Sequence, residues 1–309
     1  LIMKISTSLY FDRSTQMLGD VQANLSKTQV QLSTGKQIVK PSDEPDKASL
    51  VTRLESELSR QGSYQETLKA VNVRLTAEET ALKNTSDVMF RIKELTVQAS
   101  NDTNGKLDRK AIALEIGQLR DQILSLANSQ DSNGNYLFSG SKASQPAFAK
   151  DAQGHVIYQG DQARMQVKVG DNRRVNMNLP GSDAFTRVVR TDDKGAKTGV
   201  DFFQALSDLT DAVANSDQKM IQRGLGEIDT LQQGVSEGLA QVGADLTVVD
   251  MQNSILDEVV LQLKSTRSNI EDLDYTEAIT RMNKDQLALE AAQSSFAKIS
   301  QLNLFKFLG

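Results

Sequence analysis

The chain contains no cysteine and no tryptophan, and it has four prolines and one histidine among its 309 residues. The absence of cysteine excludes disulfide bonds and thiolate metal ligands. A nucleophile and base pair also has little support, because the base in such a pair is usually histidine. We interpret His155, which lies in a polar β-type segment, as an exposed residue at a strand edge. These absences predict that the chain is not an enzyme.

Three local patterns resemble known sites but lack an essential part of each. Residues 131–135 begin like a calcium loop, but the twelfth position is Lys142 instead of glutamate, so we interpret them as a turn. The glycines of residues 224–226 follow no predicted strand, and a third glycine is missing. Glu78 and Glu79 are adjacent carboxylates on a predicted helix, which we interpret as a solvated face. The sequence therefore predicts no catalytic residue, no metal site and no cofactor.

Aromatic residues are scarce at 5%, and no long hydrophobic run is present. Narrow helical bundles bury leucine, isoleucine, valine and alanine more easily than large rings, so this composition favours thin helical packing. The net charge of −5 lacks the basic field that a nucleic-acid partner requires. No window approaches the roughly 18 apolar residues of a membrane span. Met3 reads as the natural start, and no cationic segment followed by an apolar core comes after it. We expect no membrane partner and, if the protein is exported, no cleaved signal peptide.

The main positive signal is a series of heptad seams, in which apolar residues recur at alternating steps of three and four. The longest seam covers residues 225–270 and predicts a helix roughly 69 Å long at about 1.5 Å per residue. Further seams cover residues 11–32, 50–92, 112–126 and 279–296. A helix of such length has to lie against other helices. The seams therefore predict long antiparallel helices joined by loops.

Residues 141–197 have a different period. Apolar residues alternate with polar ones at residues 165–169 and 175–179, and the Gly-Asp-Asn sequence of residues 170–172 between them is a hairpin signal. Residues 155–159 offer another short strand. This segment is predicted to be a small β-rich insert.

The predicted fold is mainly α. It is a long antiparallel coiled-coil or helical-bundle rod, with N- and C-terminal helical arms paired at one end and the small β-rich inserted domain at the other. We expect three domains: an arm domain of residues 1–41 with 271–309, a helical rod domain of residues 42–140 with 198–270, and the insert of residues 141–197.

The arms are the candidate functional surface. Their seams are short, and only the other arm or another subunit is available to cover them; the two arms also carry opposite net charge. We therefore expect the apolar seam residues of both arms to make subunit contacts. In the N-terminal arm these are Phe11, Leu18, Val21, Leu25 and Leu32, and in the C-terminal arm Ile279, Met282, Leu289, Phe296, Ile299, Leu302 and Phe305.

Several motifs resemble the bacterial flagellin superfamily. They are LSTGKQI at residues 32–38, SDEP at 42–45, RIKELTVQASN at 91–101, DYTEA at 274–278 and AAQ at 291–293. MKISTS at residues 3–8 and GNYLFSGS at 134–141 are more similar to the branch of hook-filament junction proteins than to flagellin itself. The chain departs from the usual flagellin ending with LFKFLG at residues 304–309.

The resemblance implies a structural adaptor of the extracellular flagellum that joins hook to filament and self-associates in a ring through its arms. It implies as partners an adjacent hook-associated protein, flagellin on the filament side, and a cytoplasmic export chaperone on the C-terminal arm. It also implies type III export without a cleaved signal peptide. Two alternatives stay open: a short flagellin that forms the filament, and a secreted adhesin or needle-tip type of protein.

Overall fold

The computed structural model describes residues 2–101, 103–191 and 195–308, with side chains described for residue 9 and residues 11–298 within those ranges. The chain is mainly α-helical with a small β region, which confirms the predicted fold class. It divides into two compact units. The terminal unit contains residues 1–60 and 258–309, and the central unit contains residues 61–257.

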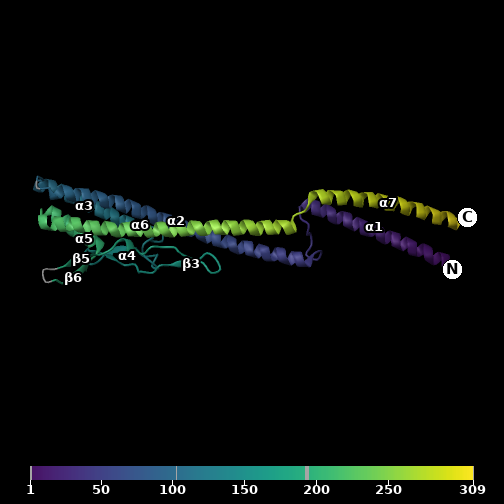
Figure 1. The fold of residues 1–309 in the computed structure, drawn as a ribbon, viewed down its shortest axis with the longest axis horizontal. Helices are drawn as coiled ribbons and strands as arrows, with labels where there is room; N and C mark the ends of the chain where they lie inside the picture. The colour runs from purple at the N-terminus through teal and green to yellow at the C-terminus, as the bar shows by residue number, and fades with distance from the viewer. Residues whose placement is uncertain (1, 102, 192–194, 309) are drawn as a thin grey trace. The chain divides into compact units, whose positions relative to one another are not determined.

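The long helices follow the heptad seams (Figure 1). They are α1 (Ile2–Thr34), α2 (Pro45–Ser100), α3 (Lys106–Ala127), α6 (Gln218–Glu271) and α7 (Tyr275–Leu308). The shorter α5 (Phe202–Ala214) precedes α6. Proline suits the first position of α2, because its missing N–H has no helical partner there. Gly35, with φ of 70°, ends α1, and its N–H donates to the carbonyl of Gln31 at 2.8 Å.

The central unit has its core along one stripe of α6. Buried residues recur in α6 at steps of seven, as in a coiled-coil seam. Polar contacts join α6 to α2: Asn72 Nδ2 donates to Asp250 Oδ1 at 3.1 Å, and Gln232 Nε2 donates to Ser86 Oγ at 2.8 Å. The central part of the long seam is therefore a packing surface within one chain. The buried residues of this α6 stripe, of which the first precedes the predicted seam, are Ile221, Ile228, Val235, Val242, Val249 and Leu256.

Within the described residues, the strands form three two-stranded antiparallel sheets. The predicted hairpin is present as β3 (Gln166–Lys168) and β4 (Arg174–Asn176), and β2 (Val156–Tyr158) lies in the other predicted strand. The sequence did not predict β1 (Phe148–Lys150), which pairs with β2, or the pair β5 (Val188–Thr191) and β6 (Lys197–Val200). The last strand, β6, thus extends beyond residue 197, where the predicted insert ends. A one-turn helix, α4 (Gly181–Ala184), lies between β4 and β5.

An aromatic cluster packs the β region against α5. Phe148 contacts the rings of Tyr158, Phe185 and Phe203 at centroid distances of 5.1 to 5.2 Å. Most pairs in the cluster are tilted or edge-to-face, the arrangement that ring quadrupoles favour. The few aromatic residues of the chain are thus concentrated where the β region meets the helices. The cluster consists of Phe138, Phe148, Tyr158, Phe185, Phe202 and Phe203.

A tight turn at Gly140 fixes the start of the β region. Its φ is 68°, and a Cβ at this position would lie 2.1 Å from Asp161 Oδ1. The Asp161 carboxylate accepts hydrogen bonds from the Ser141 N–H at 2.8 Å and from the Ser141 hydroxyl. Tyr158 Oη donates to the carbonyls of Phe138 and Asp161 at 3.0 and 2.7 Å. These contacts give the end of the GNYLFSGS motif a structural role, in which only glycine fits position 140.

Glu78 is fully buried, so our interpretation of it as part of a solvated face is wrong. Its Oε2 accepts a hydrogen bond from the Leu179 N–H at 3.0 Å, and its Oε1 lies 3.5 Å from Arg74 Nε. Burial raises the pKa of Glu78 to about 8, although the Arg74 charge acts in the opposite direction. Its position on the α2 seam explains the burial. Glu78 therefore joins α2 to the segment between β4 and α4.

Arg74 links the same part of α2 to the loop after α3. Its guanidinium donates to the carbonyl oxygens of Tyr136 and Leu137 at 3.2 and 2.9 Å and pairs with Asp131 Oδ2 at 3.3 Å. Asp131 Oδ1 in turn accepts hydrogen bonds from the N–H groups of Asn133 and Asn135 at 2.8 and 2.9 Å. The segment that begins like a calcium loop is therefore a turn held by its own aspartate, as interpreted from the sequence.

Candidate functional site

The candidate site is the pair of helices α1 and α7, which lie side by side in the terminal unit (Figure 1). They run antiparallel, because Gly35 lies beside Leu273 at one end and the rings of Phe11 and Phe296 meet further along, with centroids 4.9 Å apart. The two arms predicted from the sequence therefore pair with each other within one chain.

The heptad seams of the two helices share one register. A step of seven residues from the Phe11 and Phe296 pair places Leu18 opposite Leu289. A second step places Leu25 opposite Met282, and these four aliphatic side chains are all half-buried. The seam is thus one row of facing apolar residues, as in a two-stranded coiled coil.

The joint at the base of the arms brings together two of the motifs that carry the flagellin resemblance. The N–H of Leu273 donates to the carbonyl of Gly35 at 3.0 Å, and the N–H of Gln37 donates to the carbonyl of Glu271 at 2.7 Å. Lys36 and Asp272 form the antiparallel bridge between these bonds. We call this bridge the arm joint. It places LSTGKQI beside residues 271–273, which directly precede DYTEA in the sequence.

Charged and polar side chains stabilise the arm joint. Glu271 is buried and pairs with Lys36, and its Oε2 lies 3.6 Å from Arg267 Nε. Gln31 Nε2 donates to the carbonyl of Gln37 at 2.6 Å. Asp274 caps α7, because its Oδ1 accepts the N–H groups of the first turn at 2.8 and 3.1 Å. The end of α1 and the beginning of α7 are thus fixed by backbone and side-chain contacts together.

The predicted interface residues fall into three groups. The half-buried group lies in the arm pair, whereas Phe11 and Ile279 are exposed and Phe11 also contacts Phe296. The side chains of Ile299, Leu302 and Phe305 lie outside the described residues. The assignment of these positions to subunit contacts stays a prediction. The half-buried group contains Leu18, Val21, Leu25, Leu32, Met282, Leu289 and Phe296.

Sequence reasoning missed several of the apolar residues that the arms expose. Leu9, Met17 and Leu287 have 52%, 64% and 67% of their surface accessible. They lie off the heptad seam. An apolar residue at a position outside the seam is the signal that would have identified them. These three exposed side chains give the outer surface of the arm pair the capacity to bury against another molecule.

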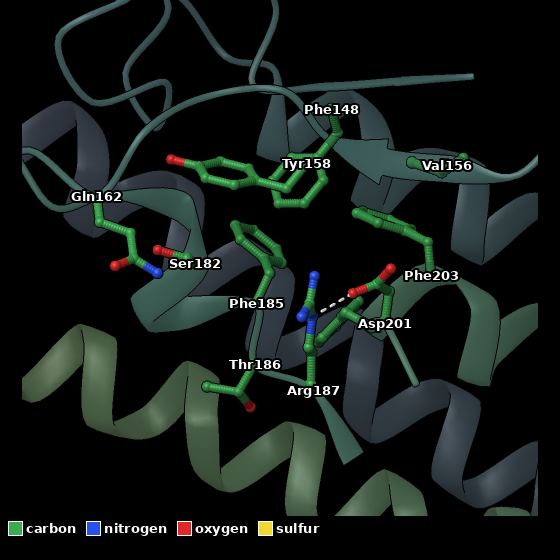
Figure 2. A pocket seen from close by; sticks show the side chains of 11 residues that line it. Phe148, Val156, Tyr158, Gln162, Ser182, Phe185, Thr186, Arg187, Asp201 and Phe203 are labelled. Atoms are coloured by element: carbon green, nitrogen blue, oxygen red, sulfur yellow. Dashed lines mark hydrogen bonds and ion pairs between the residues drawn. The ribbon is translucent and has the colours of Figure 1, made fainter. Parts of the chain in front are cut away.

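A second candidate site is a cavity of about 350 Å³ beside the aromatic cluster (Figure 2). The rings of Phe148, Tyr158 and Phe203 line it, and Arg187 and Asp201 form an ion pair at one side. Arg187 directly precedes β5 and Asp201 directly follows β6, so this pair closes the base of the two strands. The lining residues contain no nucleophile beside a base. The ring contacts and the ion pair around this cavity join the β region to the start of α5.

Among the residues that the structure describes, no group of three or more histidine, aspartate or glutamate side chains is arranged to hold a metal ion. Over the same residues, no helix combines the length and the apolar character needed to cross a membrane.

Two models of known protein families match this chain. The family model of the bacterial flagellin N-terminal helical region matches residues 5–143, and that of the flagellin C-terminal helical region matches residues 225–308. The two matches together include both arm helices and most of the chain. The chain belongs to the bacterial flagellin superfamily. Within this superfamily it is a structural protein of the flagellum.

Relatives within the flagellin superfamily match over nearly the whole chain. Flagellar hook-associated protein 3 of Salmonella typhimurium is 25% identical over 98% of this chain and 99% of its own length. The protein of the same name from Escherichia coli strain K12 is 26% identical, with the same coverage. The crystal structure of FlgL from Xanthomonas campestris is 25% identical, covers 71% of this chain and 99% of that chain, and aligns with a TM-score of 0.61.

Proposed function

We propose that this protein is the structural adaptor that joins the hook of the bacterial flagellum to its filament. The observation that carries this proposal is the match to hook-associated protein 3 over 98% of this chain and 99% of the relative. A match of that extent includes the arms, the helical bundle and the β region. In this role the hook side contacts an adjacent hook-associated protein, and the filament side contacts flagellin.

We assign the assembly contacts to the outer surface of the arm pair. The half-buried seam residues cover each other inside the pair, but Leu9, Met17 and Leu287 keep large exposed areas. Burying an apolar side chain of this size is worth about 1.5 to 3 kcal/mol, so a few such residues per subunit are sufficient to favour stacking. Repetition of one such contact by rotation closes a ring. The role is mechanical and not catalytic.

The proposal extends to the route by which the subunit leaves the cell. We propose export into the extracellular flagellum without a cleaved signal peptide, with a cytoplasmic chaperone covering the C-terminal arm before export. The apolar character of residues 299–308 supports this, because such a segment is prone to association until it is covered. The three-domain division into arms, helical rod and β-rich insert belongs to the same proposal.

The assembly role is tested by charging the outer surface of the arms while leaving their seam intact. We expect the double variant Met17→Asp with Leu287→Asp to remain helical and to lose filament attachment and motility. The matched control is Val189→Asp, which changes an equally exposed apolar residue of β5 in the central unit. Attached filaments at normal numbers in the arm variant would contradict the assignment.

A short flagellin is the second candidate function, because both matching family models describe flagellin regions. The two functions differ in the length of the assembly. Electron microscopy of the purified protein with filament seeds distinguishes them, since a junction protein forms short, limited assemblies. Long homopolymers would favour flagellin and contradict the junction role.

A further inference from the structure

The β3–β4 hairpin carries a charge conflict in its own register. Lys168 lies directly opposite Arg174, and both side chains are exposed. Like charges at directly opposed positions of two neighbouring strands are destabilising. Arg173, which precedes Arg174, adds a third exposed cation. The hairpin therefore presents a positively charged surface that lowers its own stability.

The rest of the central unit does not neutralise these cations. In the part of this unit that the structure describes, none of the three forms an ion pair. The hairpin lies against both long helices through other residues (Figure 1). Tyr64 Oη of α2 donates to Asp171 Oδ1 at 3.3 Å, and Asn176 Nδ2 donates to Asp245 Oδ1 of α6 at 3.1 Å. The three cations thus remain accessible to a partner.

A groove of about 370 Å³ lies between α2 and α6 on the face that is turned away from the β region. At 3.6 residues per turn, Asn72 lies about 160° around α2 from Arg74, which contacts the loop before the β region. By the same geometry, Asp250 lies about 140° around α6 from Asp245, which contacts the hairpin. We call this the back groove, and its polar lining consists of Gln65, Glu66, Lys69, Asn72, Asp250 and Asn253.

The back groove has an excess of negative charge. Asp250 lines it and Asp257 lies one turn further along α6, and their carboxylates accept hydrogen bonds from side-chain amides of α2 at 3.1 and 2.6 Å. A neutral amide leaves the charge of a carboxylate in place. Glu66 adds a third exposed carboxylate, and Lys69 is the single cation of the lining. The groove is therefore complementary in charge to the hairpin.

We propose that the β3–β4 hairpin of one subunit docks in the back groove of a second copy of this chain. In this contact Lys168 and Arg174 face Asp250 and Asp257 of the neighbour. The charge conflict within the hairpin is then relieved by opposite charges across the interface. The inference rests on the proposed function for its setting, which is the assembled junction.

A second copy suits both surfaces because of where they lie on one helix pair. The hairpin tip contacts α2 at Tyr64, and the groove begins at the next residue, Gln65, so the two surfaces are at one level. They occupy different faces, so each copy can give its hairpin to one neighbour and receive that of another. Such a heterologous contact generates a ring when its rotation closes. Complementary charges mainly fix how neighbours are oriented, whereas apolar surface of the arms adds affinity.

The docking is tested by cross-linking between copies in assembled flagella. Because the chain lacks cysteine, Lys168→Cys and Asp250→Cys each introduce a single thiol. Both variants are produced together in a strain without the parent protein, and isolated hooks with attached filaments are treated with a short bismaleimide. We expect covalent dimers when both variants are present and none with either variant alone, because the contact joins position 168 to position 250. Monomers only, in junctions that contain both variants, would overturn the inference.

The control for chance proximity is Lys150→Cys combined with Asp250→Cys. Lys150 is an equally exposed cation of the β region, on β1 instead of the hairpin. This combination should give no dimers. Dimers at the same yield as with position 168 would show that the cross-link does not report the proposed contact.

Charge reversal tests the pairing itself. Lys168→Glu with Arg174→Glu should lower the number of attached filaments about tenfold, the effect expected from opposed charges that become like charges. Asp250→Lys with Asp257→Lys should have the same effect. All four substitutions together should restore part of the attachment. Attachment at parent levels in both reversed variants would refute the pairing.

The matched control for charge reversal is Lys150→Glu with Lys197→Glu. It makes the same change of charge at exposed positions of β1 and β6 and should leave attachment unchanged. Helical circular dichroism of each purified variant identifies any loss that comes from misfolding, and the cysteine variants, which retain most of the charges, then decide the question. Equal losses in hairpin and control variants would contradict the inference.

The location of the cross-links separates this inference from the proposed function. If the dimers are confined to the junction between hook and filament, both stand. If the same cross-links occur throughout long filaments, the docking stands and the junction role is refuted. If junctions form without any link between positions 168 and 250, the docking fails and the proposed function is retained.

Discussion

Replacing Glu78 by glutamine should remove a pH dependence from the stability of the central unit. The folded chain holds this carboxyl in full burial, with Arg74 as the nearest charge on α2 and Asp245 of α6 opposing ionisation. Glutamine preserves the shape and the acceptor for the Leu179 N–H at 3.0 Å, but it cannot titrate. The variant therefore isolates the titration from the packing.

The sign follows from the raised pKa. Burial raises the pKa of Glu78 from 4.5 to about 8 in the folded chain. Between these values the unfolded chain loses the proton while the folded chain keeps it, so the free energy of unfolding falls as the pH rises. At about 1.4 kcal/mol per pKa unit, the loss over the whole window is about 5 kcal/mol. Below the window both states are protonated, and above it both are ionised.

The assay is urea unfolding followed by helical circular dichroism at several values from about pH 5 to about pH 8. The stability of Glu78→Gln relative to the parent should rise continuously across that range. Glu79→Gln is the control, because it removes a carboxylate from the next position of the same helix, where Glu79 is half-buried and pairs with the exposed Lys83. A constant difference between parent and Glu78→Gln would refute the reasoning.

Two further predictions concern single contacts. Gly140→Ala should destabilise the central unit by about 2 to 4 kcal/mol in urea unfolding, because positive φ and the close Asp161 carboxylate both oppose a Cβ. The control is Gly134→Ala, which is also at positive φ but in open space and should cost about 1 kcal/mol. Equal losses would contradict the steric argument. Phe11→Ala and Phe296→Ala should show a coupling of about 0.5 to 1.5 kcal/mol in a double-mutant cycle followed by amide exchange of the arms. Strict additivity would show that the rings do not interact.

The helices could be predicted because their signals repeat. In a seam such as that of α6, apolar residues recur every seven positions, so a single polar residue does not obscure the pattern. The hairpin of β3 and β4 was also readable, from alternation on both sides of Gly170. In contrast, β6 has four residues, most of them exposed, and offers no alternation to detect.

The site was predictable only in part. Sequence reasoning found the apolar seam of the arms, but it had no means of showing that Glu271 lies against Lys36, because that contact joins opposite ends of the chain. The burial of Glu78 could not be predicted from the sequence either. Its seam position indicated burial and its charge indicated solvent, and only the presence of the Leu179 N–H and of Arg74 decides between them.

The pairing of α1 with α7 has a consequence for the order of folding. Phe11 and Phe296 lie near opposite ends of the chain, so an unfolded chain would have to close a very long loop to bring them together. In the central unit, however, Gln65 Nε2 donates to Asp257 Oδ1 at 2.6 Å, which places the two points where the chain leaves this unit side by side. Once that unit has folded, only the segments of residues 1–60 and 258–309 remain to be brought together. The arms therefore pair last, and α1, although it is synthesised first, has to wait for the final residues of the chain.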